Sequence, residues 1–122
     1  MDGRLILGAD GERIATSHLE RSGYSILARN WRTGSGGIRG ELDVVARHGS
    51  TLVFVEVKTR TSDRFGGPLL AVTARKQAKL RALAGSFLRE TGTRARDLRF
   101  DVIAIDVRAG EDPRIDHRVA AF

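Results

Sequence analysis

One stretch near the middle of the chain constrains the fold more than any other. Two runs rich in valine and other strand-forming residues, 41–48 and 51–58, flank the dipeptide Gly49-Ser50. This dipeptide suits a two-residue type II′ turn, because Gly49 tolerates the positive φ that the first turn position requires. The pattern predicts a tight β-hairpin whose register is set by the turn.

In that register Asp43 faces Glu56, and Glu41 faces Lys58. Directly opposed residues share one face of a sheet, so three carboxylates and one amine are expected on one patch. The remaining positions are apolar on both faces, which is typical of strands covered on both sides. The predicted faces hold Val45, Leu52 and Phe54 beside the charged residues, and Leu42, Val44, Val53, Val55 and Val57 opposite them.

Two opposed carboxylates inside an apolar strand pair repel each other, and burial raises the cost to roughly several kcal/mol. A divalent cation between Asp43 and Glu56 would remove the conflict, because Mg²⁺ binds one or two carboxylates together with waters and phosphate oxygens. Alternatively, Glu41 and Lys58 form a cross-strand salt bridge and Asp43 lies at a hydrated strand end. A one-residue shift of register would also separate the four side chains.

The length and composition narrow the class of protein. A chain of 122 residues supports one hydrophobic core, so we expect a single domain over residues 1–122. It contains no cysteine, which excludes disulfides and thiolate metal sites. The first residues lack the apolar run of a signal peptide, and no segment approaches the ~20 apolar residues of a membrane span. We expect a soluble, cytoplasmic protein with no membrane partner.

The net charge of +6 is unevenly distributed. Residues 59–99 carry ten basic and three acidic side chains, so this segment accounts for +7 and the remainder for −1. A basic region beside an acidic cluster suits a polyanion held near a metal site. Because 18 of the 21 basic residues are arginines, which can reflect genomic base composition, the asymmetry carries more weight than the total.

A first helix is predicted from Asp10, a candidate N-cap, to about Ser22, with Gly23 ending it. An acid at position 12 begins its buried face, where an alanine would be expected. Glu12 is therefore either a favourable first-turn acid or a member of the metal site. The predicted inward stripe is Glu12, Ala15 and Leu19.

A strand over residues 24–32 and a glycine-rich loop over 33–40 are predicted next. Trp31 is interpreted as a core residue rather than a base-stacking platform. The loop enters the hairpin directly before the carboxylates. It is either a plain connector or a segment that closes over a nucleic-acid backbone, with Arg32 and Arg39 on phosphates.

A second helix is predicted from the cap Thr73 to about Glu90, ended by Gly92. Lys76 falls on its apolar stripe and should lean toward the sheet, or it is a snorkelling lysine. The candidate phosphate-binding residues are Arg32, Arg39, Arg60, Arg75, Lys76 and Lys79.

A buried strand over 99–107 and an edge strand within 114–122 complete the chain. Asp101, at the start of the buried strand, is interpreted as a local hydrogen-bonding group. The order of elements predicts an α/β domain with a mixed central sheet flanked by helices. The step from residue 51 to 107 should be a right-handed crossover.

The acidic patch predicts metal-dependent phosphodiester hydrolysis. Asp43 and Glu56 would hold Mg²⁺ or Mn²⁺, helped by the carbonyl of Val57. Lys58, two residues from Glu56 and on the same face, would orient or deprotonate the attacking water, and the metal would polarise the scissile phosphate. Glu12 would ligate a second ion or bind one through water.

Several longer motifs combine in this sequence. They are Gly11-Glu12-x-x-Ala15, Gly23-Tyr24-x-Ile26-Leu27-x-Arg29-Asn30-Trp31-Arg32, Gly40-Glu41-Leu42-Asp43, Val53-Phe54-Val55-Glu56-Val57-Lys58-Thr59-Arg60, Ala71-Val72 and Arg99-Phe100-Asp101-Val102. Over nearly its whole length the chain thereby resembles the YraN-like proteins (uncharacterised protein family 0102).

The resemblance implies a restriction-endonuclease-like core of the PD-(D/E)xK type, with the order α-β-β-β-α-β, similar to archaeal Holliday-junction resolvases. The implied nuclease positions are Glu12, Asp43, Glu56 and Lys58. Lys76 takes the place where many such nucleases carry a glutamine. Leu42 replaces the proline of Pro-Asp, and Glu41 adds a carboxylate that could pair with Lys58.

The leading hypothesis is a Mg²⁺- or Mn²⁺-dependent endonuclease acting on DNA rather than RNA, including branched DNA. Cutting a junction would suit a two-fold homodimer. The alternatives are a non-catalytic nucleic-acid-binding module of the same fold, and an interaction subunit whose acidic patch is structural.

Overall fold

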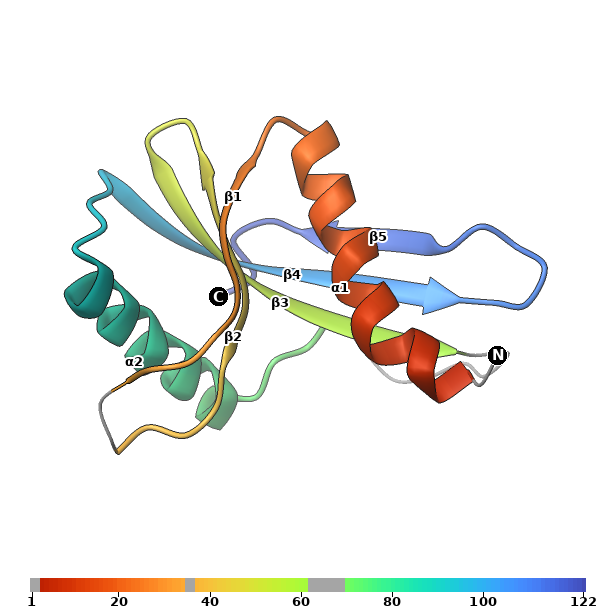
Figure 1. The fold of residues 1–122 in the computed structure, drawn as a ribbon, viewed down its shortest axis with the longest axis horizontal. Coiled ribbons are helices and arrows are strands. Elements are labelled where there is room, and N and C mark those ends of the chain that lie inside the picture. The colour runs from red at the N-terminus through yellow and green to blue at the C-terminus, as the bar shows by residue number, and fades with distance from the viewer. Residues whose placement is uncertain (1–2, 35–36, 62–69) are drawn as a thin grey trace.

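The computed structural model describes residues 3–34, 37–61 and 70–122. Within them the chain forms two helices and five strands (Figure 1). The elements are α1 (Gly3–Arg21), β1 (Ser25–Trp31), β2 (Leu42–His48), β3 (Thr51–Thr61), α2 (Ala74–Thr91), β4 (Asp97–Val107) and β5 (Arg114–Arg118). The predicted order α-β-β-β-α-β, followed by a C-terminal edge strand, is confirmed.

The strands form one mixed sheet with the order β1-β2-β3-β4-β5. The strand β2 pairs antiparallel with both β1 and β3, β3 and β4 are parallel, and β5 returns antiparallel to β4. The strands β2 and β3, which carry Asp43 and Glu56, therefore lie inside the sheet, between its β1 and β5 edges.

The hairpin has the predicted register. His48 lies opposite Thr51, and the pairing continues to Val44 opposite Val55. Gly49 has a φ of 62°, which is the left-handed conformation expected at the turn.

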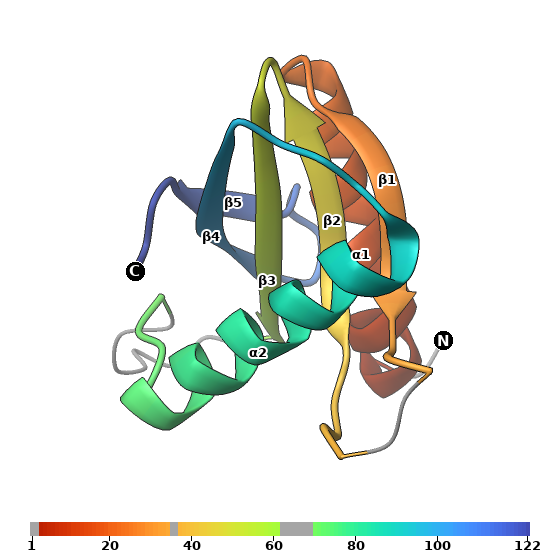
Figure 2. The same ribbon diagram turned by 90° about the vertical axis from the view of Figure 1, so that its left-hand side faces the viewer.

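Each helix covers one face of the sheet. Figure 2 shows α2 in front of the sheet and α1 behind it. On the α1 face, Ala15 and Leu19 are fully buried against valines of the hairpin and isoleucines of β4, as the predicted stripe requires. On the α2 face, Phe87 meets Phe54 and Trp31 edge to face, with ring centroids 6.0 and 5.3 Å apart. Trp31 is therefore a core residue, as predicted.

The caps of α2 also follow the sequence. Thr73 is the N-cap and its hydroxyl accepts a hydrogen bond from Lys76 N, while Gly92 ends the helix with a φ of 68°. Neither of the two described helices combines the length and apolar character needed to cross a membrane.

Two predictions need correction. The first helix begins at Gly3, and Asp10 lies inside it, where its carboxylate accepts a hydrogen bond of 2.8 Å from Arg13. The preceding residues contain no proline, and their leucines and alanine favour continuation of the helix. Leu42 was predicted on the face with Val44 but packs in the cluster on the α2 face.

The reason for the second correction is a local break in strand alternation. Asn30 lies between the paired residues Arg29 and Trp31 and has a φ of 50°, a left-handed conformation that asparagine tolerates. Leu42 pairs with Trp31 and joins it on the α2 face. The regular two-residue period therefore ends just before the hairpin carboxylates.

A glycine allows α1 to lie close to β3. A Cβ atom added to Gly11 would collide with the Thr59 hydroxyl and lie 3.1 Å from Thr59 Cβ. This close approach places the next residue, Glu12, over the sheet.

Asp101 connects several elements from a fully buried position. Its carboxylate accepts hydrogen bonds from Arg99 Nε at 2.9 Å, His117 Nε2 at 2.8 Å and Ala120 N at 3.0 Å. Burial alone would raise the pKa of Asp101, but hydrogen bonds from His117, Arg99 and Ala120 outweigh burial and lower that pKa. Its predicted role in local hydrogen bonding is confirmed.

Replacing Gly11 with alanine should destabilise the protein by roughly 1–3 kcal/mol, because the new methyl group overpacks against Thr59. In a Thr59→Ala background the same change should cost much less, since the colliding hydroxyl and methyl groups are gone. Urea unfolding of the four proteins measures this coupling. An equal cost in both backgrounds would contradict the proposed contact.

Asp101→Ala should lower the free energy of unfolding at pH 7 by roughly 3–5 kcal/mol, because it removes the buried acceptor shared by the Arg99 guanidinium, the His117 ring and the Ala120 N–H group. Asp97→Ala, at the exposed start of the same strand, should change it by less than about 0.5 kcal/mol. Because the folded-state pKa of Asp101 is lowered, its contribution is present above about pH 4 and is lost as the pH falls through the folded-state value. Urea unfolding from pH 3 to 7 tests the sign.

Candidate active site

The candidate site forms where β2 separates from β3. Regular pairing of the two strands ends with Val44 opposite Val55. Beyond it, Asp43 Oδ2 accepts a hydrogen bond of 2.8 Å from Val57 N. A side-chain carboxylate thus takes the place of the backbone acceptor that continued pairing would supply.

This geometry also orients the carbonyl of Val57. In an antiparallel ladder, the N–H and C=O groups of one residue point toward the same neighbouring strand. Because the N–H of Val57 points to Asp43, its carbonyl also faces the gap between β2 and β3. The predicted contribution of Val57 to a metal site is compatible with this placement.

Three half-buried carboxylates meet at the gap. Ligand oxygens of Glu12, Glu41 and Asp43 all lie within 4.8 Å of one another. Glu12 comes from α1, and Glu41 directly precedes β2. The prediction that Glu12 lies with Asp43 agrees with this arrangement. The predicted hairpin register placed Glu41 opposite Lys58, and the predicted metal site did not include Glu41. The position of Glu41 two residues before Asp43 was the signal that could have predicted its place beside Asp43.

Glu56 on β3 lies outside the group formed by Glu12, Glu41 and Asp43, but its charge acts on Asp43. Its side chain is 13% exposed, and Oε1 lies 3.8 Å from Lys76 Nζ. Its other oxygen, Oε2, is buried and has no hydrogen-bond partner among the residues that the structure describes. Burial raises the pKa of Glu56, although Lys76 and Lys58 oppose the shift.

The crowding is greatest for Asp43. Burial, followed by the negative charges of Glu56 and Glu12, raises the pKa of Asp43 to about 7, against the opposing effects of the Val57 hydrogen bond and Lys76. Protonation of this carboxyl group therefore takes place much closer to neutral pH than for an ordinary aspartate. An added cation would favour its ionised form.

Glu41 and Lys58 do not form the predicted opposed pair. Glu41 Oε2 accepts a hydrogen bond of 3.1 Å from Arg32 Nε, and Lys58 Nζ donates to the carbonyl of Ala71. The physical reason is that regular pairing of β2 with β3 does not extend to the residues that precede Val44. Glu41 is therefore no longer held opposite Lys58. The alternative of a Glu41–Lys58 salt bridge is therefore wrong as well.

The predicted nucleic-acid-binding residues divide into two groups. Lys76 reaches Glu56, and Arg32 reaches Glu41, so both touch the acidic site. Lys79 lies beside the chain that enters β2, since a Cβ added to Gly40 would be 2.6 Å from Lys79 Cε.

The other three form no ion pair with the site carboxylates among the described residues. Arg39 and Arg75 are exposed, and Arg60 follows Lys58 by two residues on β3. Of the glycine-rich loop 33–40 that was considered as a closing segment, residues 35 and 36 lie outside the described residues. Gly34 N donates a hydrogen bond of 2.8 Å to Glu90 at the end of α2.

The donor set fits a hard divalent cation. Mg²⁺ and Mn²⁺ prefer carboxylate, carbonyl and water oxygens. The unpartnered oxygen of Glu56, the raised pKa of Asp43 and the convergence of Glu12 and Glu41 are the features that an additional positive charge would relieve. Asp43, Glu56 and the Val57 carbonyl could hold one ion, with Glu12 and Glu41 ligating directly or through water.

Comparison with known sequences identifies many close relatives. The profile described as "Uncharacterised protein family UPF0102" matches residues 11–105. A UPF0102 protein of Beutenbergia cavernae is 51% identical over 112 residues, covering 91% of each chain. UPF0102 proteins of Rhodococcus jostii and Geobacter sulfurreducens are 45% and 47% identical, and the matches cover 97% and 96% of this chain and 97% and 88% of theirs.

Asp43→Asn should make the metal-free protein more stable than wild type at pH 8.5 by roughly 2–4 kcal/mol, and by less than half as much at pH 5. The raised pKa means that protonation of Asp43 favours the folded state, and this contribution is lost as the pH rises through about 7. Asparagine keeps an acceptor for Val57 N without the charge. Urea unfolding in EDTA at both pH values measures the difference, and an advantage that did not change with pH would contradict the assignment.

Proposed function

The chain belongs to the uncharacterised protein family UPF0102, and for this member we propose a Mg²⁺- or Mn²⁺-dependent endonuclease that hydrolyses phosphodiester bonds in DNA. The observation that carries the proposal is the arrangement at the strand gap. Asp43 is bonded to Val57, Glu56 presents an unpartnered buried oxygen beside it, and Lys58 follows two residues later.

The roles of the residues follow from their placement. A divalent ion bound by Asp43, Glu56 and the Val57 carbonyl would polarise the phosphate and stabilise the leaving oxygen. Lys58 is on the Glu56 side of β3 and would orient the attacking water or hold its proton. Its present acceptor is a backbone carbonyl, that of Ala71, so its amine can exchange that bond for a water or a phosphate oxygen.

The order of elements supports the same assignment. A helix carrying Glu12, a hairpin carrying Asp43 and the Glu56-x-Lys58 pair, and a parallel β3-α2-β4 step match what the resemblance to PD-(D/E)xK nucleases implies. The excess of arginine and lysine after β3 supports a polyanionic substrate. DNA, including branched DNA of the kind cut by Holliday-junction resolvases, is the substrate we propose.

A second candidate function is a binding module of the same fold that holds nucleic acid without cutting it. The observation that favours it is the contact between Lys76 Nζ and Glu56 Oε1 at 3.8 Å. A lysine there supplies part of the positive charge that a metal would otherwise provide. It also contacts one of the two Glu56 oxygens that could bind an ion, Oε1.

Wild-type protein should cleave plasmid and four-way-junction DNA in Mn²⁺ or Mg²⁺ and not in EDTA. Asp43→Asn and Lys58→Ala should each reduce the cleavage rate by about 10²–10⁴-fold, because they remove a metal ligand and a proton-handling group. Glu12→Gln should also reduce it, whereas Glu20→Gln, an exposed acid farther along the same helix, should not. Gel assays of the five proteins measure the rates.

Thermal unfolding separates the two candidates. The nuclease predicts stabilisation by Mn²⁺ that is lost in Asp43→Asn. DNA binding without cleavage, in which neither Mn²⁺ nor Asp43→Asn has an effect, would instead establish the binding module. That binding should still weaken steeply with salt, because phosphate contacts release counterions.

A further inference from the structure

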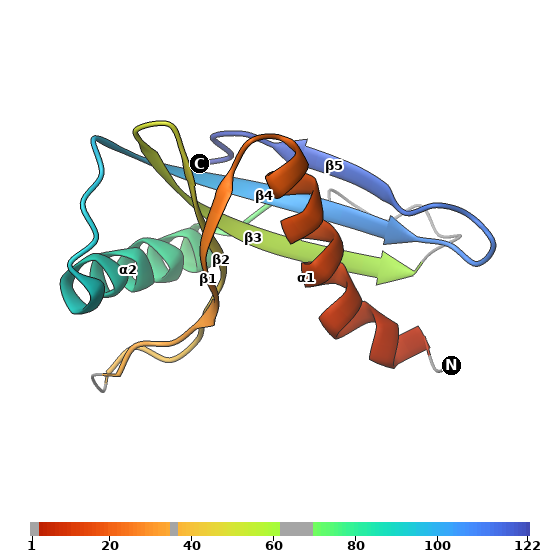
Figure 3. The same ribbon diagram turned by 45° about the horizontal axis from the view of Figure 1, so that its top comes forward.

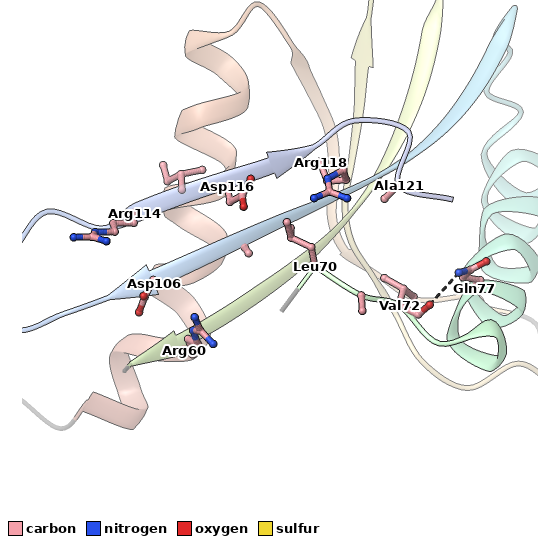
Figure 4. Close-up of a pocket in the computed structure, with 12 residues that line it drawn as sticks. Arg60, Leu70, Val72, Gln77, Asp106, Arg114, Asp116, Arg118 and Ala121 are labelled. Atoms are coloured by element: carbon pink, nitrogen blue, oxygen red, sulfur yellow. Dashed lines mark hydrogen bonds between the residues drawn. The ribbon is translucent and has the colours of Figure 1, made fainter. Parts of the chain in front are cut away.

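A second hollow begins next to the candidate active site. It has a volume of about 800 Å³ and lies over β3, β4 and β5 on the face of the sheet that α2 covers elsewhere (Figure 4). Figure 3 shows that these three strands continue past the end of α2. We call this hollow the β5 groove and define it by Arg60, Leu70, Val72, Ala104, Asp106 and Arg118.

The sheet register connects the groove to the candidate active site. Val102 on β4 pairs with Glu56 on one side and with Arg118 on the other. Directly paired residues share a face, so Arg118 lies on the Glu56 side of the sheet, about 10 Å away across two strand spacings.

Further along β3, Arg60 takes the place two residues beyond Lys58, a rise of about 7 Å. It pairs with Asp106 on β4, which in turn pairs with Arg114 on β5. An arginine, an aspartate and a second arginine therefore form one row across the groove. On the same face of β5, Asp116 pairs with Ala104 and lies between Arg114 and Arg118, so the cations of the groove, Arg60, Arg114 and Arg118, surround a second carboxylate.

The floor and wall of the groove are small or apolar. Ala104 is the β4 partner of Lys58, and its short side chain leaves the floor open. Residues 70–72 form the wall, and Lys58 Nζ is bonded to the Ala71 carbonyl of this wall. Figure 4 shows Leu70 and Arg118 pointing toward one another from opposite sides. The groove thus starts at Lys58.

Its polar groups have unused hydrogen-bonding capacity. Among the described residues, the buried atoms Arg60 Nε and Asp106 Oδ1 have no hydrogen-bond partner. The other oxygen of Asp106 accepts a hydrogen bond of 3.3 Å from Arg108. Guanidinium groups suit phosphates, an aspartate accepts from exocyclic amines of bases, and an apolar wall suits a base face.

From this geometry we propose that the β5 groove binds an unpaired DNA strand that continues from the phosphodiester at Lys58. This inference rests on the proposed function and specifies its substrate as DNA with a single-stranded arm. A volume of about 800 Å³ is that of a site for one small molecule, so it admits about one to two nucleotides and excludes a duplex. Arg60 and Arg118 would hold the phosphates, with Arg114 at the outer end.

The test compares a blunt duplex with the same duplex carrying an unpaired tail of about ten thymidines, at either the 5′ or the 3′ end. Fluorescence anisotropy in EDTA reports binding without cleavage. Wild-type protein should bind one tailed duplex at least about tenfold more tightly than the blunt one. Arg60→Ala/Arg118→Ala should lose most of this gain, and its plot of log affinity against log salt should be shallower by about 1.4.

Two further variants sharpen the result. Arg21→Ala/Arg29→Ala removes the same charge at exposed positions on α1 and β1 and should keep the tail-dependent gain. Ala104→Leu fills the floor without changing charge and should lose the gain. A tail that adds no affinity, or a gain that survives both groove variants, would overturn the inference.

Its failure can be distinguished from failure of the proposed function. Suppose that the protein cleaves plasmid DNA in a metal-dependent way but binds tailed and blunt duplexes equally. That result would support the proposed nuclease and overturn the assignment of the groove. Tail-dependent binding lost in the groove variants, without cleavage in any metal, would support the groove as a binding site and overturn the nuclease.

Discussion

The hydrogen bond from Val57 N to Asp43 Oδ2 is the interaction on which the site depends. It takes the place of a backbone hydrogen bond between β2 and β3 at the point where the two strands separate. Elsewhere along the hairpin the pairing of these strands is regular. Without the gap between them, opposed carboxylates would face each other inside a closed ladder and repel. With it, the backbone groups of β3 and the side chains around them face a common space.

The surrounding structure supplies charge to this gap from separate elements. Gly11 allows α1 to approach β3 closely enough to bring Glu12 to Asp43, and the chain before β2 adds Glu41. The helix α2 contributes Lys76 from the opposite side. Placing the half-buried Asp43 near other carboxylates is costly, and its pKa is raised by burial first and then by the charges of Glu56 and Glu12. A packed core on both faces of the sheet stabilises the arrangement.

The acidic gap and the β5 groove are parts of one surface. Glu56, Lys58 and Arg60 are every second residue of β3, so their side chains share one face of the sheet. In this order they run from the carboxylates of the acidic gap to the arginines of the β5 groove. This order suits a substrate that is held by its phosphates on one side of the bond to be cut. It also gives Lys58 a position at the boundary, where its amine now contacts the carbonyl of Ala71. A binding module without catalysis would use the same path and differ only in the role of the acidic gap.

The sequence by itself determined the local structure. The turn at Gly49 and Ser50 fixed the hairpin register, and the caps Thr73 and Gly92 fixed α2, because each depends on the backbone preferences of a few adjacent residues. The same local register predicts Asp43, Glu56 and Lys58 as candidate site residues. Only the tertiary structure decided the partners of Glu41 and Lys58, the face of Leu42 and the position of Arg118. Those depend on where β2 diverges from β3, and on how distant strands align across the sheet, which no local pattern encodes.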